Sequence, residues 1–275
     1  MDSIKPIKRT KLRLLAGRIY YTLNRNCYWA FSGMRFAKSR SAKLKHECFS
    51  HETPLIRNLQ DTDIALQYNK INNLQLAVQR LNKIVINPGE TFSYWRLIGK
   101  PTYKKGYQDG MVLFCGTVQR GVGGGLCQLS NLIYWMTLHT PLTVVERHRH
   151  SYDVFPDSDR TQPFGSGATC VYNYRDLMIR NDTKHVFQLI LNISDKYLSG
   201  SWYSDMPMHT KYEIYEINHK MERQYWGGYI RHNELRRKIY TLNRDVIADE
   251  FITENNAIMM YQPFIDYKNA QRDML

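Results

Sequence analysis

Apolar residues recur at helical spacing in two stretches of the first 82 residues. Leu12, Leu15, Ile19 and Leu23 follow one another at three- and four-residue steps, so residues 9–45 are expected to form one or two basic helices. A second helix is expected from about Asn73 to Asn82, because its apolar positions form a single stripe. These positions are Leu74, Ala77, Val78 and Leu81.

A third apolar stripe begins immediately after a glycine-rich segment. Residues 121–125 are Gly-Val-Gly-Gly-Gly, and Leu126 and Cys127 follow them. From Cys127 onward the apolar residues fall at i, i+3, i+4 and i+7, which predicts an amphipathic helix that starts at the cysteine. They are Leu129, Leu132, Ile133 and Met136. Pro141 is expected to end this helix.

The rest of the chain is typical of strands. Strands or hairpins are expected at 84–86, 107–120, Leu142–Ser151, 169–174, 186–193 and 212–217, with further hairpin segments to about 262 and a turn at Gly227 and Gly228. Helices early and strands late predict an α+β fold. We expect a helical basic N-terminal segment, followed by a mixed α/β core with mainly antiparallel strands.

Length allows either one large domain or two small ones, since 275 residues with 43% hydrophobic content can bury a full core. We predict three parts: a basic helical segment over 1–69, a central domain over 70–200, and a β-rich extension over 201–275 that packs on the same domain.

Positive charge is concentrated near the N-terminus. The formal net charge is +13, and in residues 1–49 lysines and arginines far outnumber the two acids, Asp2 and Glu47. Such an excess attracts an anionic partner. An anionic membrane surface or a charged cell-wall precursor is expected; nucleic acid is not, because charge alone supports it and no recognition module is present.

Neither a membrane-spanning stretch nor a standard signal peptide is recognisable, because Arg18, Asn24 and Arg25 interrupt the apolar run. The chain is therefore predicted to be cytoplasmic, with the basic start allowing a peripheral position at the inner membrane face.

The five cysteines are irregularly spaced, which argues against a disulfide scaffold or a paired zinc motif. Cys127, His148, His150 and Cys170 have suitable ligand types for zinc, but their spacing matches no usual pattern. We expect no metal and no cofactor.

Cys127 is the best candidate for chemistry. A thiol at a helix start lies at the positive end of the helix dipole, which lowers its pKa and favours the nucleophilic thiolate. The amides of Gly123, Gly124, Gly125 and Gln128 are candidate oxyanion-hole donors, and the side chain of Gln128 or Ser130 is a further donor.

A base is predicted on the strand that follows. If Leu142–Ser151 is extended, Glu146, His148 and His150 share one face, so a histidine can pair with Cys127 and Glu146 can orient an imidazole. Arg147 and Arg149 on the opposite face are candidates for binding a substrate carboxylate or phosphate. A structural interpretation of these residues stays open: the glycines form a tight turn, the cysteine is packed in the core, and the histidines are solvated.

Several motifs together resemble the VanW family. They are Pro88-Gly89-Glu90-Thr91-Phe92-Ser93, Gly106-Tyr107, the block from Gly121 to Ser130, and Glu146-Arg147-His148-Arg149-His150-Ser151. The similarity covers about residues 70–200. It implies a link to glycopeptide (vancomycin) resistance and cell-wall metabolism, in a system that replaces the terminal D-Ala-D-Ala of precursors.

The resemblance also implies a chemistry, because larger members of the family include L,D-transpeptidases with the glycine-block cysteine as nucleophile. On that pattern Cys127 attacks a peptide carbonyl next to a diamino acid, and an amine resolves the acyl-enzyme. The His-Ser pair then makes His150 the base, with His148 as a neighbour or substrate contact and Ser151 beside them.

This chain departs from the family in the third member of the triad. Where many members have Gly-Arg-Asp-Ala, residues 164–169 supply no carboxylate. Glu146 is the preferred substitute, and Asp153, Asp157 and Asp159 are the other candidates. Two functions remain: a cysteine acyl-transferase or peptidase acting on peptidoglycan stems or precursors, and a non-catalytic precursor-binding or membrane-associated accessory protein.

Overall fold

The computed structural model describes residues 9–56, 64–114, 116–154 and 162–263. Its helices are α1 (Lys11–Phe31), α2 (Ile64–Leu81), α3 (Tyr94–Ile98) and α4 (Cys127–Leu138), with a 3-10 turn η1 (Tyr103–Lys105). The predicted α+β class is confirmed, including the N-terminal helix. Helix α1 ends at Phe31, before Gly33 with its positive φ of 71°, so residues 32–45 are not helical.

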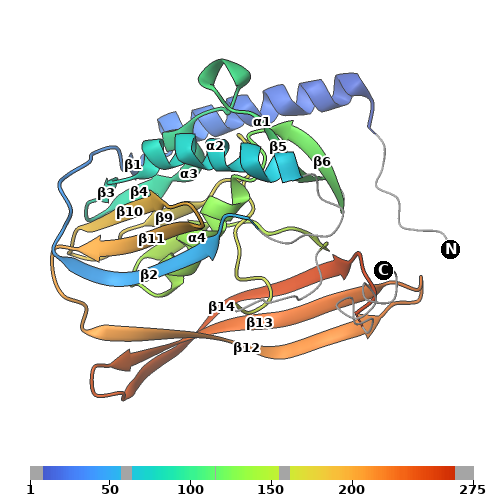
Figure 1. Ribbon diagram of the computed structural model, residues 1–275. Coiled ribbons are helices and arrows are strands. Elements are labelled where there is room, and N and C mark those ends of the chain that lie inside the picture. The colour runs from blue at the N-terminus through green and yellow to red at the C-terminus, as the bar shows by residue number, and fades with distance from the viewer. Residues whose placement is uncertain (1–8, 57–63, 115, 155–161, 264–275) are drawn as a thin grey trace.

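Two four-stranded sheets lie beneath helices α1 and α2 (Figure 1). One has the order β1-β4-β9-β7, built from β1 (Arg35–Phe36), β4 (Glu90–Ser93), β9 (Met178–Arg180) and β7 (Thr143–Glu146). The other has the order β2-β11-β10-β3, built from β2 (His46–Pro54), β11 (Tyr197–Ser204), β10 (Phe187–Ile193) and β3 (Val85–Ile86). Most of the pairs are antiparallel, as predicted; β1 and β4 run parallel.

The core lies between these sheets and helices α2 and α4. Its largest fully buried side chains include Trp202, Tyr94, Tyr134, Phe92 and Phe187. Trp202 of β11 donates its indole N–H to Thr137 Oγ1 of α4 at 3.2 Å, which satisfies a buried donor and fixes the helix on the sheet. Because β2 pairs with β11, residues 46–54 belong to this core although they precede the predicted central domain.

Three long strands form a separate layer, seen across the lower part of Figure 1. They are β12 (Thr210–Arg223), β13 (Tyr229–Thr241) and β14 (Val246–Met259), with the short β8 (Tyr152–Asp153) at the edge. Gly227 makes the β12–β13 turn as expected, with φ of 86°. Arg237 of β13 joins this layer to the core by donating to the carbonyls of Leu138 and Thr140 at 3.3 and 3.1 Å.

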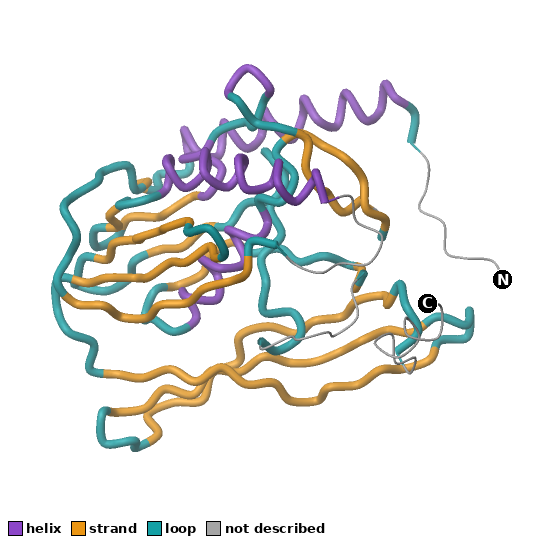
Figure 2. The backbone as a smooth tube through the Cα atoms, viewed as in Figure 1, coloured by secondary structure: helices purple, strands orange, loops and turns teal. Residues whose placement is uncertain are grey.

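One predicted strand is too long and another is wrong. The strand expected over Leu142–Ser151 ends at Glu146, because its partner β9 has only three residues and a bulge interrupts their register. The strand expected at 169–174 is instead a turn closed by a bridge between Val171 and Arg175. Figure 2 distinguishes the strands, in orange, from the loops and turns that join them, in teal. The hairpin β5 (Asp109–Phe114) and β6 (Thr117–Val122) matches the expectation for 107–120.

Candidate functional site

The glycine-rich loop between β6 and α4 is shaped by close backbone packing. Gly123 and Gly125 have positive φ angles of 75° and 89°, a region that side chains rarely adopt. Gly124 lies so close to β5 that a Cβ atom on it would be 2.1 Å from the carbonyl carbon of Gly110. Asn73 of α2 clamps the loop by donating to the Gly124 carbonyl at 3.0 Å. These glycines are therefore required by the fold.

The glycine amides do not form the predicted oxyanion hole. Gly123, Gly124 and Gly125 donate to the carbonyls of Gln108, Gly121 and Met111 at 2.9–3.0 Å. The Gln128 amide donates to the Gly125 carbonyl at 3.0 Å. Within the described residues, the amides of Leu126 and Cys127 donate to no backbone carbonyl, so these N–H groups at the start of α4 are the remaining candidate donors.

Helix α4 begins at Cys127, as predicted from the apolar stripe. The Cys127 Sγ lies 3.7 Å from the carbonyl oxygen of Cys170. The expected lowering of the thiol pKa is wrong: burial raises the pKa of Cys127 and outweighs the backbone hydrogen bonds that lower it. The thiol is therefore protonated in this conformation at neutral pH.

Gln128 and Ser130, predicted as substrate contacts, are held by the fold. The Gln128 amide nitrogen Nε2 donates to Thr53 Oγ1 at 2.9 Å and to the Pro54 carbonyl at 2.8 Å, which fastens α4 to β2. The fully buried Ser130 hydroxyl donates to the Ala168 carbonyl at 2.6 Å. Both side chains position the cysteine loop.

Glu146 is the centre of a half-buried polar cluster at the end of β7. Its two carboxylate oxygens each accept a hydrogen bond from the guanidinium of Arg25 at 2.6 Å. Oε1 also accepts from the Asp176 amide and lies 3.0 Å from His148 Nε2. Burial alone would raise the pKa of Glu146, but the hydrogen bonds from His148, Arg25 and Asp176 lower it to about 2. The carboxylate is ionised at every physiological pH.

The two candidate histidines have different surroundings. His148 pairs with Glu146, and its carbonyl accepts from the Thr169 amide at 2.8 Å, one residue from the Cys170 carbonyl that contacts the thiol. Among the described residues no carboxylate pairs with His150; burial and the charge of Arg175 lower its pKa to about 4. Glu146 thus orients the imidazole of His148, although His150 was predicted as the base.

Neither histidine hydrogen-bonds the Cys127 thiol in the described part of the chain. The backbone of segment 168–170 separates them: it accepts from Ser130 on one side and donates to the His148 carbonyl on the other. The cysteine and the Glu146–His148 pair are neighbours across one short segment, and direct proton transfer between them requires this segment or the imidazole to move.

The two arginines of the same block differ in availability. Arg147 donates to the carbonyls of Gly165 and Gly167 and to Thr253 of β14, and its guanidinium stacks over Tyr134, so it is a structural clip. Arg149 is half-buried, and burial lowers the pKa of its guanidinium to about 10. Ser151 is exposed. Arg149 is therefore the better candidate for an anionic substrate group.

Sequence reasoning missed two residues of this cluster, Asp176 and Arg25. Asp176 is buried; it accepts from the Ser93 hydroxyl at 2.5 Å and from the amides of Trp95 and Leu177 at 2.9 Å, and burial raises its pKa to about 6. The sequence signal that could have identified Asp176 is its position directly before the apolar run that starts at Leu177. No local pattern could join Arg25 to a partner 121 residues away.

Of the other carboxylates proposed for the triad, the structure describes Asp153 alone, and it pairs elsewhere. Asp153 pairs with Arg231 at 3.4 Å and accepts from the Tyr261 hydroxyl, in the layer of long strands. Asp157 and Asp159 lie outside the described residues. In the described ranges, no three His, Cys, Asp or Glu side chains are grouped to hold a metal ion.

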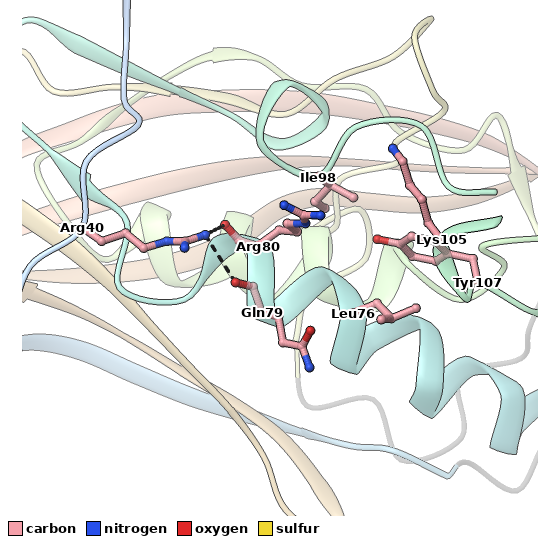
Figure 3. Close-up of a pocket in the computed structure, with 7 residues that line it drawn as sticks. All are labelled: Arg40, Leu76, Gln79, Arg80, Ile98, Lys105 and Tyr107. Atoms are coloured by element: carbon pink, nitrogen blue, oxygen red, sulfur yellow. Dashed lines mark hydrogen bonds between the residues drawn. The ribbon is translucent and has the colours of Figure 1, made fainter. Parts of the chain in front are cut away.

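A surface hollow of about 240 Å³ lies elsewhere, between α2 and η1 (Figure 3). It is lined by Arg40, Leu76, Gln79, Arg80, Ile98, Lys105 and Tyr107. The guanidinium of Arg40 donates to the carbonyls of Gln79 and Arg80 at 3.3 and 2.7 Å, so it fastens the end of α2. None of the predicted site residues lines this hollow.

Comparison with known proteins places this geometry in a family. A family model described as "VanW like protein" matches residues 69–203. The chain is 34% identical over 207 residues to the vancomycin B-type resistance protein VanW of Enterococcus faecalis, a match that covers 74% of this chain and 75% of that protein. The chain belongs to the VanW family.

A second relative matches over a shorter stretch. The chain is 31% identical over 100 residues to the uncharacterized protein YoaR of Bacillus subtilis, which covers 35% of this chain and 33% of that protein. No solved structure matches the chain. The matched range of the family contains Cys127, Glu146, His148 and His150.

Proposed function

We propose that this VanW-family protein takes part in glycopeptide resistance by acting on peptidoglycan stem peptides or their lipid-linked precursors. Cys127 is the nucleophile and His148 the base. The observation that carries the proposal is the oriented Glu146–His148 pair one short segment away from the thiol at the start of α4. The resistance association rests on the similarity to the Enterococcus protein.

The chemistry follows from the charges of the cluster. An ionised Glu146 holds the imidazole and stabilises the imidazolium that forms when His148 takes the thiol proton. The thiolate attacks a peptide carbonyl, and the amides of Leu126 and Cys127 at the start of α4 donate to the oxyanion that forms. Collapse of the adduct breaks the C–N bond, the imidazolium protonates the departing amine, and a thioester remains.

A second amine or water completes the cycle. It attacks the thioester, gives its proton to His148 and displaces the Cys127 thiolate, which yields a new amide or a free acid. A substrate is needed to start this sequence, because burial raises the thiol pKa in the free protein. Substrate binding beside segment 168–170 would bring the imidazole and the sulfur together.

His148 is preferred to His150 for a physical reason. A general base is most effective when its pKa lies near the working pH, and burial beside Arg175 lowers that of His150 to about 4. His150 also lacks the carboxylate partner that His148 has in the described structure. This revises the role that the resemblance alone implies.

A non-catalytic precursor-binding protein is the second candidate. It is supported by the internal use of the glycine amides, Gln128, Ser130 and Arg147, and by the raised pKa of the buried thiol. In that case Arg149 and the half-buried histidines form a recognition surface, and Cys127 only packs.

Trapping the thioester separates the two candidates. The full chain is incubated with stem tetrapeptides and pentapeptides, quenched in acid, and analysed by intact and peptide mass spectrometry. The catalytic proposal predicts an acyl adduct on Cys127 that is lost in Cys127→Ala and reduced at least about tenfold in His148→Gln. Peptide binding that is equal in the wild type and Cys127→Ala, with no adduct, establishes the binding function instead.

A further inference from the structure

Helix α1 carries a stripe of apolar side chains that the protein does not cover. Leu12, Leu15, Ile19 and Leu23 lie on one side of the helix and are exposed by 80%, 53%, 53% and 59%. None of the 21 residues of α1 is buried. In Figure 1 the helix runs along the outer side of the molecule. A contiguous exposed apolar stripe of this kind marks an interaction surface.

The opposite side of α1 is attached to the candidate site. Arg25 binds Glu146, and Tyr21 packs edge-on against Tyr174 with ring centroids 4.5 Å apart. Residues two positions apart lie about 160° apart around a helix, so Leu23 points away when Arg25 points inward. The attachment therefore fixes the direction of the stripe, which faces outward as a consequence of the fold.

The charge around the stripe selects its partner. Besides Arg25, which is paired with Glu146, helix α1 carries Lys11, Arg13 and Arg18 and has no acidic residue. Two copies of this chain that met through their stripes would bring like charges together, which opposes self-association. An anionic lipid surface supplies both the apolar layer and the negative charge. None of the described helices is long and apolar enough to cross a bilayer, so α1 would lie in the interface plane.

We propose that α1 is an interfacial helix, which docks the protein on an anionic lipid bilayer through Leu12, Leu15, Ile19 and Leu23. The docked helix holds the Glu146–His148 pair at a fixed distance from the bilayer through Arg25. Surface docking needs no chemistry at Cys127, so it stands or falls independently of the proposed function.

Vesicle sedimentation tests this proposal. The full chain is mixed with vesicles of equal parts phosphatidylcholine and phosphatidylglycerol, or of phosphatidylcholine alone, and pelleted. Binding to the anionic vesicles is expected, with little binding to the neutral ones. Replacing Leu12, Ile19 and Leu23 by Gln should lower the partition coefficient at least about tenfold. Circular dichroism checks that the helix persists.

A matched control removes the same number of exposed apolar side chains elsewhere. Val246, Ile247 and Phe251 of β14 are exposed by 59%, 55% and 57%, and their replacement by Gln should leave vesicle binding unchanged. Cys127→Ala should bind vesicles like the wild type. Arg13→Gln with Arg18→Gln should weaken binding to the anionic vesicles alone.

Three results would overturn the proposal. The first is a wild-type chain that stays in the supernatant with anionic vesicles. The second is equal binding by the α1 and β14 variants. The third is a wild-type dimer in sedimentation velocity that the α1 replacement converts to a monomer, since the stripe is then covered by a second copy.

Discussion

The glycine–cysteine block at 121–130 and the Glu-Arg-His block at 146–151 lie next to each other but use their polar groups differently. In the first block the glycine amides, Gln128 and Ser130 are all bonded within the fold. In the second, Arg147 and Glu146 are bonded within the fold, Glu146 also orients His148, and Arg149 stays half-buried. The first block builds the position of one thiol; the second carries groups that can act on it.

This contrast changes how such motifs are interpreted. Glycines beside a cysteine suggest an oxyanion hole, but here close packing requires them: a Cβ on Gly124 would meet the Gly110 backbone, and one on Gly125 would meet the Lys70 side chain. The carboxylate that orients a histidine is Glu146 of the second block, and Arg25, which lies outside both blocks, binds it. The comparison predicts that substitutions in the first block affect stability and those in the second affect chemistry.

The largest expected effect is on the glycine loop. Gly124→Ala places a Cβ on the backbone of Gly110, which cannot move cheaply, and should lower the free energy of unfolding by about 3 kcal/mol. Gly17→Ala is the control, because nothing lies within 4 Å of its added Cβ on α1; it should raise stability by about 0.5–1 kcal/mol. Urea denaturation followed by circular dichroism measures both. Equal effects would show that the loop tolerates a side chain.

The next effect concerns the Arg25–Glu146 pair. Arg25→Met leaves a half-buried carboxylate without its cation and should cost about 2 kcal/mol of stability, below the value for a fully buried pair because solvent reaches both groups. Arg18→Met removes a cation from the same helix and should change stability by less than about 0.5 kcal/mol. If both variants unfold alike, the pair does not join α1 to the site.

Acid should weaken the same cluster in a defined direction. The pKa of Glu146 is lowered from 4.5 to about 2 in the folded chain, so its contribution is complete above the unfolded value and is lost as pH falls toward 2. Between about pH 5 and about pH 3 the wild type should therefore lose about 2 kcal/mol more stability than Glu146→Gln. Parallel stability curves for the two proteins would contradict this assignment.

The smallest of these effects is that of His150. Its pKa is lowered from 6.5 to about 4, so stability is complete above 6.5 and is lost as pH falls through this range. His150→Gln should remove about 1 kcal/mol of that acid sensitivity, a value reduced because the ring is partly solvated. The pKa of His139 is also lowered to about 4 by burial, so the acid sensitivity that His139 contributes should remain in His150→Gln. An unchanged pH profile would mean that His150 is freely solvated.

The fold was predictable where one element carries its own pattern. The stripe from Leu129 to Met136 correctly predicted that α4 starts at Cys127. The apolar positions of α2 also predicted a helix, but the helix starts at Ile64, earlier than the expected Asn73. The predicted range of strand β7 was too long, because the length of a strand depends on its partner and β9 has only three residues.

The candidate site was predictable in its residues more than in their connections. Glu146 orienting an imidazole was anticipated, but its pairing with His148 depends on the chain leaving the sheet after β7, which alternation along a strand cannot reveal. The raised thiol pKa depends on burial, and the Arg25 contact on tertiary packing.

The most direct test of the central claim is the rate of Cys127 alkylation as a function of pH, read by peptide mass spectrometry in the presence of a stem peptide. If His148 is the base that deprotonates Cys127, His148→Gln should slow alkylation of Cys127 about tenfold near neutral pH. His150→Gln should change the rate less than about twofold. Cys48, whose pKa burial raises to about 12, should stay slow in every variant. A larger effect from His150→Gln, or none from either, would contradict the account.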